Sequence, residues 1–272
     1  MKVLLQSLSL FPADLLLGTK RLVKEVKESG FDGLELINFS HRGLAKILEM
    51  AERCRDEGLE FHAHQLWGYR QNPALWVNKA FRLARLIPLD GSNLIAQFGD
   101  HLDVPMVVYS DHMREASSTP GMWVQTCCTH HKGRPAVPYS VFKSTVLERG
   151  IPLVFDNQHQ LEYRNDLISI SELPMDSDVL FDQVSEDWST FRHLIREIHL
   201  CDFDQSLGPE RGRNVPLSQG RFPLVRFIEM VECSNWDGFV VPEVKPNVLG
   251  NLSSRSRAKF LHALSDQVRD LL

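Results

Sequence analysis

The sequence lacks several features that would assign it quickly to a class of protein. No stretch reaches the roughly 18 uninterrupted apolar residues of a membrane-spanning helix. The charge balance is not basic, because 30 Lys and Arg stand against 35 Asp and Glu and give a formal net charge of −5. We therefore expect neither a nucleic acid nor a membrane as partner, and a small-molecule substrate instead.

A disulfide framework and a cleaved leader are not expected either. The five cysteines, at positions 54, 127, 128, 201 and 233, are an odd number without a repeating spacing. This usage is typical of reduced thiols, so we expect a cytoplasmic protein. The opening MKVLLQSLSLFPADLLLG resembles a signal peptide only faintly, since it has no small-residue cleavage site and Asp14 interrupts the apolar run. We predict a first strand there.

Short apolar runs alternate with longer helical patterns along the whole chain. Most runs are apolar throughout, as in strands buried on both faces. Eight βα units in 272 residues predict an α/β protein with a single (β/α)8 TIM barrel domain over residues 1–272. A doubly wound open sheet is the alternative, but the first βα turn has no phosphate-binding glycine fingerprint. The predicted strands lie near residues 2–10, 33–38, 59–65, 105–112, 151–158, 177–183, 197–203 and 238–244.

Residue types that bind metal ions gather at the carboxyl ends of these predicted strands, where barrel enzymes place their chemistry. A lone His in a strand is more often a core residue, and a lone Asp is usually a helix cap. Together, carboxylates and imidazoles from different strands suit one divalent cation such as Mn²⁺, Mg²⁺, Co²⁺ or Zn²⁺. The residues are Glu35, His62, His64, Asp111, His112, Asp156, Asn157, Asp182, His199, Asp202 and Glu243.

Several short motifs resemble the xylose-isomerase-like barrels, a group that includes sugar-phosphate isomerases and epimerases and the AP endonuclease family. FDGLELI and FHAHQLWGY resemble the second and third strands of that group. PLVFDNQ resembles a fifth strand that usually ends in Glu-Asn, and VLFDQVS resembles the sixth, usually Asp followed by His three residues on. EIHLCDF, GRNVPLSQGRFP and FVVPEV resemble the seventh strand, the loop after it and the eighth strand.

The resemblance implies a metal held by one side chain from each of strands five to eight. The matching residues are Asp156, Asp182, His199 and Glu243. It also implies that the metal polarises a sugar carbonyl while two carboxylates, Asp156 and Glu243, move a proton through a cis-enediolate. His64 and Arg213 are expected to hold substrate oxygens, with His112 and Trp67 beside them. A homodimer is also an expectation from the group.

Three departures from the group's pattern leave alternatives open. The predicted fifth strand ends in Asp156 rather than Glu, Ser185 stands for the usual His of the sixth, and Asn214 stands for a His of a second metal site. These changes and the acidic net charge disfavour an AP endonuclease. The leading function is a metal-dependent isomerase or epimerase of a small sugar, sugar-phosphate or keto-acid. The alternatives are a lyase that dehydrates a polyol or keto-acid, and a non-catalytic sugar-binding barrel with a degenerate metal site.

Overall fold

A computed structural model of the chain describes residues 1–10, 17–38, 44–65, 104–127, 130–131, 134–135, 137–167, 169–245 and 248–272. Two sequence-based expectations, the helical stretch within 73–102 and the substrate contact of Trp67, lie outside these residues. Among the residues that the structure does describe, no helix combines the length and the apolar character needed to cross a membrane.

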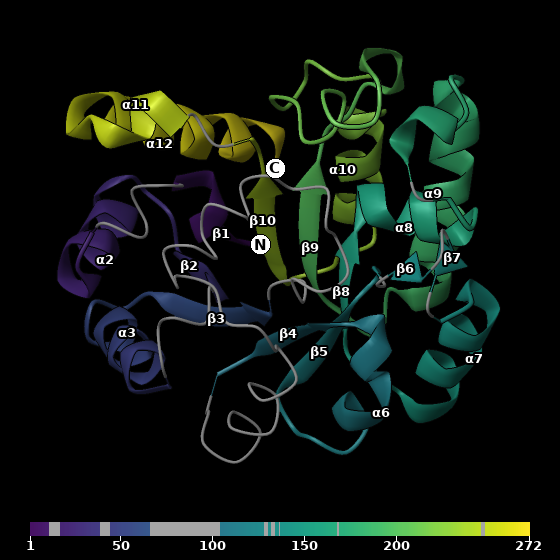
Figure 1. Cartoon of the computed structure of the whole chain (residues 1–272), viewed down its shortest axis with the longest axis horizontal. Helices are drawn as coiled ribbons and strands as arrows, with labels where there is room; N and C mark the ends of the chain where they lie inside the picture. Colours follow the sequence, from purple (N-terminus) through teal and green to yellow (C-terminus); the bar gives the residue numbers. More distant parts are fainter. Residues whose placement is uncertain are drawn as a thin grey trace.

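Eight parallel strands close into a barrel, in the order β1-β10-β9-β8-β5-β4-β3-β2 (Figure 1). They are β1 (Lys2–Gln6), β2 (Gly33–Asn38), β3 (Glu60–Gln65), β4 (Met106–Tyr109), β5 (Met122–Gln125), β8 (Leu153–Asp156), β9 (Ile195–Cys201) and β10 (Phe239–Glu243). The predicted (β/α)8 TIM barrel is therefore confirmed. A separate antiparallel pair, β6 (His130–His131) and β7 (Arg134–Pro135), lies in the segment between β5 and α7 (Tyr139–Arg149).

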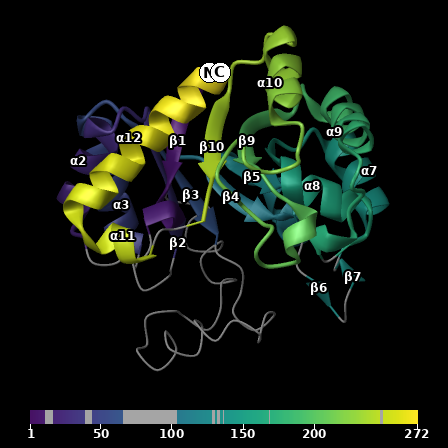
Figure 2. The same cartoon turned by 90° about the horizontal axis from the view of Figure 1, so that it is seen from above.

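Helices cover the outside of the barrel (Figures 1 and 2). The described ones, besides α7, are α2 (Thr19–Glu28), α3 (Leu44–Asp56), α6 (Met113–Ala116), α8 (Asn157–Arg164), α9 (Ser177–Phe191), α10 (Leu224–Cys233), α11 (Val248–Leu252) and α12 (Ser254–Leu271). Short 3-10 turns at Ser7–Leu10, Ser110–His112, Ile170–Glu172 and Gln205–Leu207 follow or link these elements.

Two predicted elements are wrong, and they shift the count of the strands. The predicted sixth strand, residues 177–183, is the first half of α9. Its short apolar run does not by itself distinguish a strand from a helix. Asp176 caps the amino end of α9, since its side chain accepts from the N–H of Asp178. Leu180, Val184 and Phe191 are buried along one face at helical spacing.

The strand that replaces it is β5, inside the segment 113–136 that the sequence analysis treats as a polar loop. Only four residues long, β5 pairs with β4 on one side and β8 on the other. Residues 151–158 therefore contain the sixth strand of the barrel, β8, rather than the fifth. The seventh and eighth strands, β9 and β10, keep the places in chain order that the sequence predicts.

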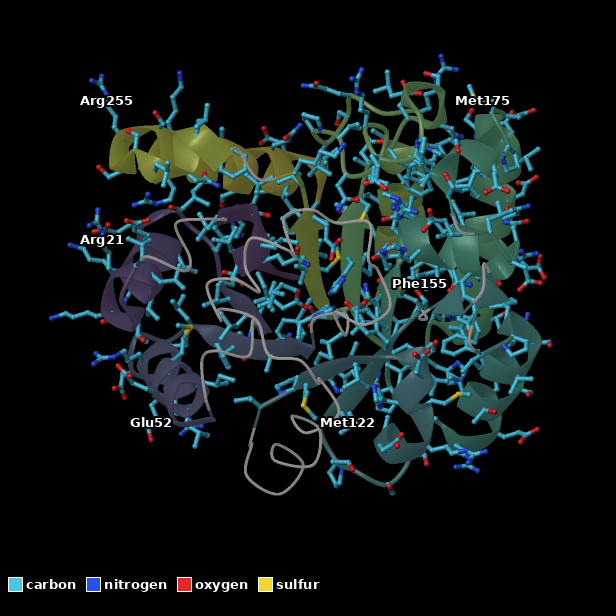
Figure 3. The ribbon with its side chains drawn as sticks, in the orientation of Figure 1. Arg21, Glu52, Met122, Phe155, Met175 and Arg255 are labelled. Atoms are coloured by element: carbon cyan, nitrogen blue, oxygen red, sulfur yellow. The ribbon has the colours of Figure 1, made fainter. Side chains whose placement is uncertain are left out.

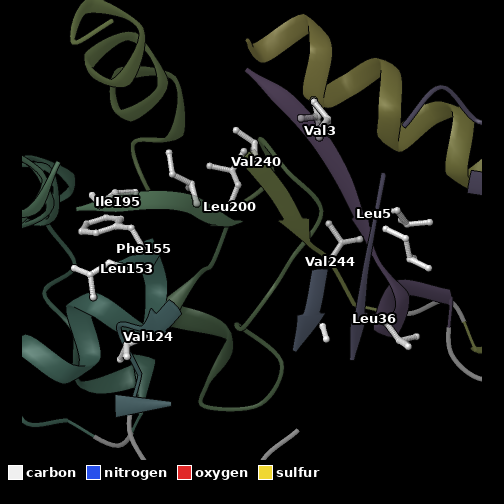
Figure 4. Close-up of a cluster of buried hydrophobic side chains, with 14 of the residues drawn as sticks. Val3, Leu5, Leu36, Val124, Leu153, Phe155, Ile195, Leu200, Val240 and Val244 are labelled. Atoms are coloured by element: carbon white, nitrogen blue, oxygen red, sulfur yellow. The ribbon is translucent and has the colours of Figure 1, made fainter. Parts of the chain in front are cut away.

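Side chains on the strands alternate between an outer apolar layer and the barrel interior. Phe155 of β8 is fully buried in the outer layer, against Trp188 of α9 and Phe227 of α10 (Figures 3 and 4). By contrast, Arg21, Glu52 and Arg255 point away from the barrel on the outer sides of their helices (Figure 3). Burial of the apolar layer, worth roughly 25 cal/mol per Å² of apolar surface, fixes which alternate residues face inward.

Aromatic rings fill the amino-terminal end of the barrel interior. The imidazole of His62 on β3 packs edge-on against Trp123 of β5 and Phe239 of β10, with ring centroids 5.1 and 4.5 Å apart. The Trp123 and Phe239 rings themselves stack at 6.2 Å. This layer fills the amino-terminal end of the interior. We call the other end, where the strands finish and the side chain of Glu243 is 12% exposed, the open end.

The helix α12 lies across α2 beside β1 (Figure 2), and a partly buried ion pair joins the two helices. The guanidinium of Arg257, 3% exposed, donates from Nε and one terminal nitrogen to the two carboxylate oxygens of Glu25 at 2.6 and 2.7 Å. Burial alone would raise the pKa of Glu25, but Arg257 and Arg21 together outweigh it and the pKa lies below its ordinary value of 4.5. The pair therefore stabilises the folded chain at neutral pH.

Replacing Glu25 with Ala should lower the free energy of unfolding by about 3–5 kcal/mol, because Arg257 stays buried without its partner. Urea denaturation measures this change. The control is Glu28→Ala, which removes an exposed partner of Lys24 and should cost about 0–1 kcal/mol. Because the folded-state pKa is depressed, the difference between wild type and Glu25→Ala should be full above pH 4.5 and shrink as the pH falls through the folded pKa. Equal costs for the two variants would contradict the role of the pair.

Candidate active site

Polar side chains line the interior of the barrel near the carboxyl ends of its strands. Hydrogen bonds join them into one network that reaches seven of the eight strands. All are buried except Glu243, which is partly exposed at the open end. The members are Gln6, Glu35, His64, Gln125, Asp156, Glu197, His199, Cys201 and Glu243.

The imidazole of His199 lies at the centre of this network. Its Nε2 is 2.9 Å from Oε2 of Glu35 and 3.0 Å from Oε1 of Glu197. Its Nδ1 faces the other way, 2.9 Å from Oε1 of Glu243 and 4.0 Å from Oδ2 of Asp156. Burial alone would lower the pKa of His199, but the charge of Glu35 and the hydrogen bonds to Glu197, Glu243 and Glu35 raise it well above its usual range.

Glu197 fixes the imidazole from the amino-terminal side. One of its oxygens accepts from His199 and the other contacts Nδ1 of His62 in the aromatic layer. Glu197, His199 and Cys201 alternate on β9, so all three face inward. Because Nε2 of His199 contacts two carboxylates, the orientation of the ring is fixed. Nδ1 therefore points to the carboxyl ends of β8 and β10.

Gln125 ends β5 and contacts three members of the network. Its Oε1 accepts from Nε2 of His64 at 3.1 Å, and its Nε2 donates to Oδ2 of Asp156 at 3.0 Å. The same Nε2 lies 3.1 Å from Nδ1 of His199. The ring of His64 stacks on that of His199 at 5.4 Å, and Nδ1 of His64 is buried without a hydrogen-bond partner among the described residues.

Two carboxylates meet at Cys201. Its thiol lies 3.8 Å from Oδ1 of Asp156 and 3.8 Å from Oε2 of Glu243, and the three ligand atoms of this group lie within 4.8 Å of one another. Burial raises the pKa of the Asp156 carboxyl. Burial would raise that of Glu243 as well, but hydrogen bonding and the charge of His199 lower its pKa to about 2. Gln6 donates to Glu243 and to Glu35, so it links the first two strands to the eighth.

The assignment of Asp156 to the fifth strand is wrong, and so is the reading of Ser185 as a lost histidine. Asp156 ends the sixth strand and caps α8, since its Oδ1 accepts from the N–H of His159 at 2.8 Å. Asp156 and His159 thus have the Asp-x-x-His spacing expected of that strand. Asp182 and Ser185 lie on α9, where Asp182 is exposed, so the structure does not bring Asp182 to the network.

The structure places the other predicted substrate contacts in different surroundings. His64 joins the network, as described above. Arg213 faces Glu162, whose two carboxylate oxygens it contacts, and Glu162 also accepts from Nδ1 of His159 at 2.9 Å. His112 is half-buried in the turn after β4, and burial lowers its pKa.

Sequence reasoning missed Gln6, Gln125 and Glu197. Gln6 ends the first strand, and Glu197 lies two residues before His199 on the same strand face, so period-two spacing could have found both. Gln125 was hidden because its strand lies among glycine, threonine and histidine residues that favour a loop. If residues 153–156 are taken as the sixth strand, a fifth strand must lie between β4 and β8, in the segment 113–136.

No protein-family model matches the chain, and no curated protein matches its sequence. Solved structures match its fold. A 3-keto-D-glucoside 4-epimerase from E. coli superposes with a TM-score of 0.58 at 15% identity, over 97% of this chain and 99% of that one. A xylose isomerase domain protein from Salmonella typhimurium gives 0.57 at 12% identity, over 98% and 96%. An AP endonuclease of family 2 from Brucella melitensis gives 0.54 at 12%, over 93% and 96%.

The chain has the fold of the xylose-isomerase-like barrels. Identities of 15% and below establish the fold alone. Within this barrel, the carboxyl ends of strands five to eight carry Gln125, Asp156, His199 and Glu243. The residues at these ends are thus two carboxylates, one imidazole and one neutral amide.

This set fits a divalent cation. Oxygen and imidazole donors suit Mn²⁺, Mg²⁺, Co²⁺ and Zn²⁺. Nδ1 of His199 faces the two carboxylates, while its Nε2 is held by Glu35 and Glu197, the outer arrangement that orients histidine ligands in metal sites. Asp156, Cys201 and Glu243 form one group of candidate ligand atoms, and Glu35, His64 and His199 form a second beside it.

Asp202 follows β9. Its carboxylate holds the loop after this strand by hydrogen bonds to the backbone, and we call these contacts the loop anchor. Its Oδ1 accepts from the N–H of Phe203 at 2.8 Å and its Oδ2 from that of Gly220 at 2.9 Å. A Cβ added at Gly220 would lie 2.0 Å from Oδ1 of Asp202, so only glycine allows this approach. The anchor holds the loop that carries Asn214, whose side chain donates to Oε2 of Glu243 at 3.4 Å.

Asp202→Asn should lower the free energy of unfolding by about 1–3 kcal/mol, because the new amide group faces a buried N–H that loses its acceptor. Urea denaturation gives the value. Asp237→Asn is the control, since the Asp237 side chain is 90% exposed and its loss should cost about 0–1 kcal/mol. An Asp202 variant as stable as wild type would show that the loop is held by other contacts.

Proposed function

We propose that this barrel is a metal-dependent enzyme that isomerises or epimerises a small sugar or a related hydroxy-carbonyl compound. The observation that carries the proposal is the convergence of Asp156, Glu243 and Nδ1 of His199 at the open end of the barrel. Similar folds that include a sugar epimerase add support. Acidic and imidazole side chains gathered in a partly buried site are typical of catalytic centres.

Asp156, His199 and Glu243 would hold the cation, with Gln125 beside them. When bound, a divalent cation polarises a carbonyl and so acidifies the C–H next to it. Asp156 is the fixed member of this set, because its two oxygens already accept from the backbone of His159 and from the amide of Gln125. These contacts orient its carboxylate toward the site.

Glu243 is the proposed base that moves the proton. Its side chain is 12% exposed whereas that of Asp156 is fully buried, so Glu243 is the carboxylate that a substrate reaches from the open end. Oε1 is held by Gln6 and His199, while Oε2 has longer contacts, 3.4 Å to Asn214 and 3.8 Å to Cys201. Oε2 is therefore the oxygen that would take up the proton.

His64 is the proposed ligand for a substrate oxygen. Its Nδ1 is buried and unpartnered within the described part of the chain, whereas its Nε2 is held by Gln125. A buried polar atom without a partner costs free energy that a bound hydroxyl can recover. His112 stays a proposed contact at the same end of the barrel, and Trp67 a proposed contact outside the described residues. Arg213 is proposed to act through Glu162, with which it is paired.

Isothermal titration with Mn²⁺ tests the metal site directly. Wild type should bind about one equivalent, and Asp156→Asn and Glu243→Gln should each weaken binding by more than the roughly 10–100-fold that outer-shell changes cost. Asp182→Asn is the matched control, because it removes an exposed carboxylate on α9 and should bind Mn²⁺ as wild type does. In thermal denaturation, Mn²⁺ should raise the Tm of wild type and of Asp182→Asn by similar amounts, and that of Asp156→Asn and Glu243→Gln by less.

A second candidate, a non-catalytic sugar-binding barrel, is favoured by one observation. Gln125 places a neutral amide where the group usually has a carboxylate. A wild-type chain that binds no Mn²⁺, Zn²⁺ or Co²⁺ and gains no thermal stability from them would contradict the enzyme proposal. Binding of neutral sugars by that metal-free chain would then establish the second candidate.

A further inference from the structure

The carboxylates around His199 are not distributed evenly. Glu35 and Glu197 contact Nε2, on the side of the ring away from the proposed cation. Asp156 and Glu243 lie on the Nδ1 side and both contact the thiol of Cys201 at 3.8 Å. Gln125 takes the remaining position on that side, at the end of the fifth strand. Its amide can donate or accept hydrogen bonds, but it cannot remove a proton from carbon.

Asp156 and Glu243 differ in how free they are to act as a base. Both oxygens of Asp156 accept hydrogen bonds, from the N–H of His159 and from the amide of Gln125, and its side chain is fully buried. Glu243 is 12% exposed, and its Oε2 has only the longer contacts to Asn214 and Cys201. Among the described residues of this network, Glu243 is therefore the carboxylate available as a base on the Nδ1 side, and Gln125 does not add a second one.

We propose that this site is a single-base isomerase, which interconverts an aldose and a ketose and does not invert a carbon centre. The inference rests on the proposed function, and it specifies which of its two reactions occurs. Gln125 is the residue that decides the outcome. Glu243 serves both as the base that removes the carbon-bound proton and as the acid that returns it.

The proton balance of the reaction needs no outside reagent. Glu243 removes the proton from C2 of an aldose; the C–H electron pair forms the C1–C2 double bond, and O1 takes a proton from solvent water to give the cis-enediol. The O2 hydroxyl proton then passes to solvent as C2=O2 forms, and the carboxyl of Glu243, which is 12% exposed and exchanges its proton with solvent, protonates C1. Both carbon steps use one face, so one carboxylate suffices. Epimerisation would require an acid on the opposite face of the same carbon, and the amide of Gln125 cannot serve as that acid.

The test is incubation of the Mn²⁺-loaded chain in D₂O with D-fructose, D-tagatose, D-allulose and L-ribulose in turn, followed by NMR and chromatography. We expect at least one ketose to gain deuterium at C1 and to give a single aldose, with no epimeric ketose. An epimeric ketose as the main product would overturn the inference and leave the proposed function standing. Mn²⁺ binding without deuterium exchange into any sugar would overturn both.

Gln125→Glu provides the sharper comparison. A carboxylate at this position adds a second base and a charged metal ligand. Epimeric ketose should therefore appear at least about 10-fold above the wild-type level, a conservative figure because general acid–base catalysis typically contributes about 100-fold or more. Titration with Mn²⁺ should show tighter binding than in wild type, a readout that does not depend on turnover. Gln183→Glu on α9 adds the same charge outside the site and should change neither result. Tighter Mn²⁺ binding with an unchanged product mixture would show that Gln125 is not the deciding residue.

Discussion

The burial of several carboxylates around one imidazole is the constraint on which the rest of this site depends. Glu35, Glu197 and Glu243 all lie within 3.0 Å of a ring nitrogen of His199, and buried carboxylates are costly without a positive charge beside them. The imidazole is the group they surround, and their charge and hydrogen bonds raise its pKa. A divalent cation at Nδ1 would offset the same negative charge, so the cluster also fits a metal.

The alternation of side chains along short strands makes this cluster compatible with a stable barrel. Val124, Phe155 and Leu200 pack into the apolar layer (Figure 4). Their chain neighbours Gln125, Asp156 and His199 occupy the alternate, inward positions. Polar residues thus concentrate in the interior without weakening the contact between strands and helices. Stability comes from one face of each strand and chemistry from the other.

The sequence predicts the barrel and most of its strands because strands buried on both faces appear as continuous apolar runs. It fails where that signal is ambiguous. The run around Leu180 suits a buried strand until its helical spacing to Val184 and Phe191 is considered, and β5 is only four residues long. One misplaced strand then shifts the assignment of the site: Asp156 moves from the fifth strand to the sixth, Asp182 leaves the site, and Gln125 enters it. His199 and Glu243 are unaffected, because they lie on strands whose order the error does not change.

The ring layer formed by His62, Trp123 and Phe239 limits the route by which small molecules can reach the site. Because these side chains fill the amino-terminal end of the interior, a small molecule that reaches His199 would approach it from the carboxyl ends of the strands. A substrate and the compound made from it must then use the site in turn, so accumulated product competes directly with incoming substrate. Net flux through such a site depends on how quickly the surroundings remove what it releases.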